Sequence, residues 1–211
     1  MNIPVKPQCQ ICREPYEGTF LIGSNDVQWT CKKCGQSNVA ILGLDVTTGV
    51  QVWIKSSYEL SQTKDASMAV ILAATAVDCE LSFLFSKWTG IAQLPQRGHL
   101  LTDEECAEML REFGGIQDKL KKVTKLLVPE GLQHFVSTTD KWRDVILKDF
   151  PELDITCLIK SIDRALFWPR NRILHGGHAA TAQQGERCVK VAQICLGIFR
   201  DMDYVKRRTL P

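Results

Sequence analysis

The chain has 211 residues and a formal net charge of +2, with 45% hydrophobic and 24% charged residues. These proportions are typical of soluble globular proteins and exclude a disordered or fibrous chain. Because the charge is nearly balanced, nucleic-acid binding would have to come from a local patch, not from a global basic excess. The length allows one ordinary domain and a small additional module.

The apolar segments are too short for a signal peptide or a membrane span. Met1–Lys6 has no apolar core of the length that a secretory signal needs. The longest nearly apolar run, Met68–Val77, is interrupted by Thr75 and ends before Asp78, whereas a membrane span needs about 20 apolar residues. We therefore expect a cytoplasmic protein.

The nine cysteines divide into a clustered group and a scattered group. Four of them form two Cys-x-x-Cys pairs, and the other five mostly lie within apolar helical patterns. This division indicates a reducing compartment, with metal at the clustered four and buried thiols elsewhere. The scattered cysteines are Cys79, Cys106, Cys157, Cys188 and Cys195.

The paired cysteines have the spacing of a structural zinc site. Eighteen residues separate the pair Cys9 and Cys12 from the pair Cys31 and Cys34. Each pair can form a turn that offers two sulfurs to one tetrahedral ion. Gly35, directly after the second pair, suits the left-handed turn that such a site requires. We predict one Zn²⁺ held by four thiolates, with chance pairing and redox dithiols as the alternatives.

Short β-type runs surround the two cysteine pairs. They cover Gly18–Ile22, Val27–Thr30, Val39–Leu44 and Val50–Ile54, separated by turn residues. This pattern resembles a zinc ribbon, and we assign it to residues 1–58. A closed four-thiolate site leaves no coordination position for a substrate, so the metal is expected to be structural.

The predicted ribbon carries residues that nucleic-acid or protein binding would use, namely Arg13, Trp29, Lys32 and Lys33. Residues 1–60 nevertheless contain five Lys or Arg and five Asp or Glu, so they have no excess of positive charge that would form a basic stripe. A folding unit with an interaction surface is therefore favoured over direct nucleic-acid binding.

From Ser61 onward the hydrophobic period becomes that of helices, which predicts an all-α bundle over residues 59–211. Ala66–Trp88 is expected to be a long and nearly buried helix. Glu80 falls on its apolar side, where a lone carboxylate would cost several kcal/mol. An arginine or histidine from Trp168–Gly177 is the expected partner; the alternative places Glu80 at an edge of the bundle.

Several further helices are predicted between this helix and the carboxyl end. A capping box at Thr102 begins one that Gly114 and Gly115 end. A second, Ile116–Val128, carries a lysine face that is either solvated, which we favour, or directed to a nucleic-acid backbone. The lysines are Lys119, Lys121, Lys122 and Lys125. The remaining helices are predicted at residues 140–150, 155–167 and 181–205, the last with an apolar stripe of Cys188, Val191, Cys195, Ile198 and Met202.

The segment Trp168–Gly177 combines a proline, charged and amide groups, an imidazole and two glycines. Pro169 predicts the first turn of a short helix, which the glycines end just after His175. Asn171 and His175 then lie four residues apart on one face, and Arg170 lies about 100° around the helix from Asn171. The three side chains suit a phosphate-handling site; an exposed arginine with a capping histidine is the alternative.

The pattern Arg170-Asn171-x-x-x-His175 between the last two long helices resembles the HEPN family (higher eukaryotes and prokaryotes nucleotide-binding domain). The resemblance covers residues 60–211, although its specific part is six residues, and residues 90–140 form an insertion relative to small members. It implies a metal-independent endoribonuclease whose homodimer joins two motifs into one site. Members serve in toxin–antitoxin, antiviral-defence or RNA-processing systems, and some have lost catalysis.

These residues are consistent with cleavage by the 2′-hydroxyl of RNA. His175 can take the hydroxyl proton or protonate the leaving oxygen, while Arg170 neutralises charge on the phosphorane-like transition state. Asn171 would orient His175 or the phosphate. No phosphate loop or carboxylate cluster for catalytic magnesium occurs in the sequence. The alternative function is a non-catalytic adaptor of the same fold that binds nucleic acid or protein.

Overall fold

A computed structural model describes residues 4–5, 12, 14, 20–21, 27–35, 37–40, 47–97 and 101–209. The chain forms two compact units, Met1–Thr47 and Thr48–Pro211. The division lies between Thr47 and Thr48, eleven residues before the boundary expected from the sequence. The described part of the chain is mostly helical, which confirms the helical character predicted for the second unit.

The described residues of the first unit form two short antiparallel pairs of strands. β1 (Pro4–Val5) pairs with β2 (Phe20–Leu21), and β3 (Val27–Thr30) pairs with β4 (Ser37–Ala40). Cys31 directly follows β3, so the second Cys-x-x-Cys pair lies in the connection of the β3–β4 hairpin. The predicted strand at Val27–Thr30 is confirmed.

The strand predicted at Val50–Ile54 is wrong, because these residues belong to the helix α1 (Thr48–Tyr58). Tertiary contacts on a helical face explain the difference. Trp53 Nε1 donates a hydrogen bond to the carbonyl of Val189 at 3.0 Å, and Ser56 Oγ donates one to the carbonyl of Ala69 at 2.6 Å. The apolar alternation of five residues was too short to decide between strand and helix.

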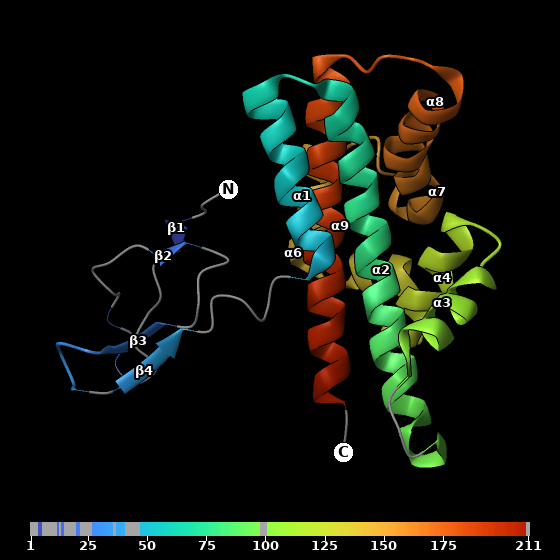
Figure 1. Ribbon diagram of the computed structural model, residues 1–211. Coiled ribbons are helices and arrows are strands. Elements are labelled where there is room, and N and C mark those ends of the chain that lie inside the picture. The colour runs from blue at the N-terminus through green and yellow to red at the C-terminus, as the bar shows by residue number, and fades with distance from the viewer. Residues whose placement is uncertain are drawn as a thin grey trace. The chain divides into compact units, whose positions relative to one another are not determined.

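The helix α2 (Ala66–Arg97) is central to the second unit and confirms the predicted long helix. In Figure 1 it runs beside α1 and α9, with α4 and α8 on its other side. By length and composition Ala66–Gln93 is the one helical stretch among the described residues that is apolar enough to cross a membrane; half of it is buried within the protein. Its core residues include Ala69, Val70, Ala73, Val77, Leu81, Leu84 and Trp88.

The remaining elements of the second unit follow in chain order, and η1, α4, η3, α8 and α9 contact α2. They are η1 (Glu59–Thr63), α3 (Asp103–Arg111), α4 (Ile116–Leu127), α5 (Gly131–Thr138), α6 (Asp140–Asp149), η2 (Ile155–Cys157), α7 (Leu158–Ile162), η3 (Asp163–Phe167), α8 (Trp168–Gly176) and α9 (Ala182–Arg208). The predicted capping box at Thr102 is present, and Thr181 forms another with Gln184 at the start of α9. The predicted apolar stripe of α9 is buried.

One member of the predicted lysine face points into the protein. Lys119 is buried, and its Nζ donates to the Asp78 carboxylate and, at 2.6 Å, to Ser82 Oγ. Lys121, Lys122 and Lys125 are exposed. The face is therefore a row of three exposed lysines, and Lys119 ties α4 to α2.

Candidate functional site

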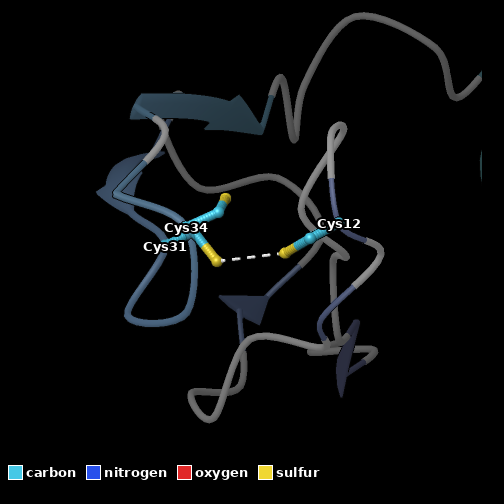
Figure 2. A group of neighbouring side chains, drawn as sticks. All are labelled: Cys12, Cys31 and Cys34. Carbon is cyan, nitrogen blue, oxygen red and sulfur yellow. Dashed lines mark hydrogen bonds between the residues drawn. The ribbon is translucent and has the colours of Figure 1, made fainter.

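Three cysteine thiols of the first unit lie close together. The Sγ atoms of Cys12, Cys31 and Cys34 are all within 4.8 Å of one another, and those of Cys12 and Cys31 are 3.6 Å apart (Figure 2). A tetrahedral zinc site with Zn–S distances near 2.3 Å separates its sulfurs by about 3.8 Å. The spacing therefore fits one metal ion. Cys9, the fourth predicted ligand, lies outside the described residues.

The turn after β3 positions two of these thiols. Gly35 has a φ of 70°, and its amide donates a hydrogen bond to the carbonyl of Cys31 at 2.8 Å. Only a residue without Cβ adopts this left-handed conformation readily. Lys33 forms an exposed ion pair with Glu14 at 2.8 Å, which joins this turn to the segment of Cys12. The hydrogen bond and charge of Glu14 raise the pKa of Lys33.

The second candidate site is the helix α8, whose predicted end after His175 is confirmed. Its predicted start at Pro169 is not, because α7, η3 and α8 form continuous helical backbone from Leu158 to Gly176. The helix covers Trp168–Gly176, with Pro169 in its first turn. Gly177 adopts a φ of 64° and donates its amide to the carbonyl of Arg172. Gly177 therefore ends the helical segment that carries all three residues of the predicted phosphate-handling motif.

The three motif residues are only partly brought together. Asn171 and His175 are exposed, while Arg170 is half-buried. Arg170 Nη1 lies 3.4 Å from Asn171 Oδ1, and its buried Nε has no hydrogen-bond partner among the described residues. Within that part of the chain the His175 side chain makes no hydrogen bond or ion pair. Asn171 thus contacts Arg170 and does not orient His175 in this structure.

Glu80 has a different neighbour from the one expected. It is 6% exposed, and its Oε2 would lie 2.7 Å from a Cβ placed on Gly49, in the first turn of α1. The segment after α8 instead meets the start of α2, where Ala180 donates its amide to Ser67 Oγ at 2.9 Å. Thirteen residues, or about 20 Å of helix, separate Ser67 from Glu80. Among the described residues, neither Arg170 nor His175 forms a hydrogen bond or ion pair with Glu80, so the structure does not show the support expected of Glu80.

Residues that the sequence did not single out form a stack on α8. The guanidinium Cζ of Arg172 lies 4.8 Å from the centroid of the Trp168 ring. Its Nη2 lies 3.4 Å from both ring nitrogens of His178. The guanidinium of Arg172 is therefore within hydrogen-bonding range of the imidazole of His178. The signals in the sequence were the four-residue spacing of Trp168 and Arg172 and a histidine directly after the two glycines.

The surroundings of α8 are rich in positive charge. Between Asp163 and Glu186 the sequence contains three arginines and two histidines, and no acidic residue. None of the three arginines forms an ion pair with another described residue. These arginines are Arg164, Arg170 and Arg172. The local charge is therefore available to an anionic ligand.

Comparisons with protein-family models, with characterised proteins and with solved structures give no match to this chain. The resemblance to HEPN domains therefore rests on residues 170–175 and on the helical character of the second unit.

Proposed function

We propose that the helical unit is a metal-independent endoribonuclease of the HEPN type. The observation that carries the proposal is the exposure of Asn171 and His175, one turn apart on α8 and free of competing ion pairs. A histidine that no neighbour holds is available to a substrate as a general base or acid. The unpaired arginines around α8 supply the positive charge that a phosphodiester requires.

The three motif residues would divide the chemistry of one transesterification. His175 would remove the proton of the 2′-hydroxyl, which attacks the adjacent phosphorus and displaces the 5′-oxygen. Arg170 would bind the non-bridging oxygens as negative charge builds on them. Asn171 would hold a phosphate oxygen or the guanidinium of Arg170. The products would be a 2′,3′-cyclic phosphate and a 5′-hydroxyl.

If one His175 acts as the base, no described group of the same motif protonates the 5′-oxygen leaving group. Base and acid must act on opposite sides of the phosphorus, and one imidazole does not reach both in a single step. We therefore propose that two chains form a homodimer, in which the α8 helices face one another and the second His175 protonates the leaving group. Such a site would be composite, with residues from both chains.

The first unit is proposed to hold one structural zinc ion. Cys9, Cys12, Cys31 and Cys34 would supply four thiolates, which is the donor set that Zn²⁺ prefers in closed sites. The fit of the three described sulfurs to one ion supports this proposal. A closed site has no open position for a substrate, so the zinc would stabilise the unit and take no part in cleavage.

Incubation of the purified protein with mixed RNA in excess EDTA tests the proposed activity. Wild type should cleave, while His175→Ala and Arg170→Ala should not. His134→Ala is a matched control, because His134 is also exposed but lies on α5. Equal fragmentation of the RNA by wild type and all three variants would show that a contaminating nuclease is responsible. Binding of RNA without cleavage by wild type would instead support the adaptor function.

A further inference from the structure

The exposed ring of Trp168 has no evident role in the proposed catalysis. We propose that Trp168, with Arg172 stacked on it, binds an unpaired nucleobase of the RNA that contacts α8. This inference rests on the proposed function in one respect only, namely that the ligand of α8 is RNA. It adds a binding subsite next to the catalytic residues and does not depend on whether the phosphate is cleaved.

The arrangement of the ring is fixed by its neighbours. The guanidinium of Arg172 contacts both the indole of Trp168 and the imidazole of His178. His178 reaches this position because Gly176 leaves room for it; a Cβ at Gly176 would lie 2.8 Å from His178 Cδ2. The amide of His178 also donates to the carbonyl of Arg172 at 3.3 Å. His178 therefore holds Arg172 in place beside Trp168 through a side-chain contact and through a backbone hydrogen bond.

The indole of Trp168 is accessible to a ligand. Trp168 is 55% exposed, whereas Trp88 and Trp142 are 2% and 7% exposed in the core. A large aromatic ring left in water forfeits the free energy of its burial unless something covers it in use. One side of this ring already faces a cation, so the remaining exposed surface is the part that a ligand would cover.

The charge around the ring favours a nucleic acid as that ligand. No acidic residue occurs between Asp163 and Glu186, and Arg164 and Arg170 make no ion pair with other described residues. Unpaired bases stack on aromatic side chains and on arginine planes, while their phosphates seek positive charge. An acidic protein surface would satisfy the arginines but would leave the indole without a planar partner.

Trp168 also lies within reach of the proposed catalytic residue. Trp168 and His175 are seven residues apart, which places them on the same side of α8 about 10 Å apart along its axis. A strand that presents its phosphate to His175 can therefore place a neighbouring base on Trp168. Bases in a duplex are already stacked on each other, so the subsite should select unpaired RNA.

Fluorescence anisotropy with a labelled, uncleavable 2′-O-methyl single strand tests this subsite without requiring catalysis. Trp168→Ala should raise the Kd by about tenfold, and Trp168→Phe should recover most of that loss because a ring remains. Binding of a duplex of the same sequence should be weaker and insensitive to Trp168→Ala. Tyr204→Ala is the matched control, since Tyr204 is 58% exposed and has Arg208 5.7 Å from its ring centroid on α9.

The outcomes separate the subsite from the ribonuclease proposal. Binding that depends on Trp168 in a protein that does not cleave RNA would support the subsite and reject the enzyme. Cleavage with unchanged Kd in Trp168→Ala, or an equal loss in Tyr204→Ala, would reject the subsite alone. Sedimentation that shows Trp168→Ala as a monomer and wild type as a dimer would assign the indole to the subunit interface, and would also overturn the proposal.

Discussion

Glu80 and Gly49 are in direct contact where α1 begins. A Cβ on Gly49 would lie 2.7 Å from Glu80 Oε2 and 2.6 Å from the carbonyl oxygen of Ala76. The positive end of the α1 helix dipole therefore lies beside a carboxylate that is only 6% exposed. The first turn of α1 therefore packs closely against α2.

Replacement of Gly49 by alanine should destabilise the helical unit by about 2 kcal/mol, because the added methyl group meets a backbone carbonyl and a buried carboxylate. Urea unfolding followed by circular dichroism measures this change. Gly114→Ala is the matched control, since a Cβ there would have nothing within 4 Å. Equal midpoints for the two variants would contradict the close packing of α1 on α2.

Asp203 ties the end of α9 to α2. Its carboxylate accepts hydrogen bonds from Lys87 Nζ at 2.7 Å, Trp88 Nε1 at 2.6 Å and Arg207 Nε at 2.8 Å. Asp203→Ala should cost about 3 kcal/mol of unfolding free energy, because it leaves these donors without their acceptor. Asp144→Ala serves as the control, since the pair of Asp144 with Arg143 is exposed and should contribute little.

The contribution of Asp203 should also depend on pH. Burial raises the pKa of this carboxyl group, but hydrogen bonds from Lys87, Trp88 and Arg207 outweigh burial and lower it below its ordinary value. Because the folded-state pKa of Asp203 is lowered, its ionised carboxylate stabilises the folded protein above about pH 4. This stabilisation is lost as the pH falls through the folded-state pKa. The difference in unfolding free energy between wild type and Asp203→Asn should therefore be constant from about pH 5 to 8 and shrink in acid. A constant difference down to pH 2 would disagree with this ionisation.

Metal analysis tests the zinc proposal. Protein purified without chelators should contain about one zinc ion per chain, and Cys31→Ser and Cys34→Ser should lose it. Cys157→Ser is the control, because this exposed thiol lies in the helical unit and outside the cluster. Retention of zinc in both cluster variants, or its absence from wild type, would contradict the proposed zinc site.

The sequence predicted the helical elements best where several signals agreed. Gly177 predicted the end of α8, and the periodic apolar residues of α2 and α9 identified both long helices. Val50–Ile54 was misassigned because its alternation is short, and the contact of Gly49 with Ala76 is visible only after folding. The neighbours of Glu80 and the stack of Trp168 on Arg172 likewise depend on tertiary geometry, which residue spacing alone does not define.

Cleavage of a defined RNA in EDTA, compared with the same strand carrying one 2′-deoxy sugar at the cut, tests the central claim most directly. Wild type should cleave only the all-ribose strand and leave a 2′,3′-cyclic phosphate, and His175→Ala should be slower by at least about a hundredfold. Cleavage of the 2′-deoxy linkage, or an unchanged rate for His175→Ala, would contradict a ribonuclease that uses His175 and the 2′-hydroxyl.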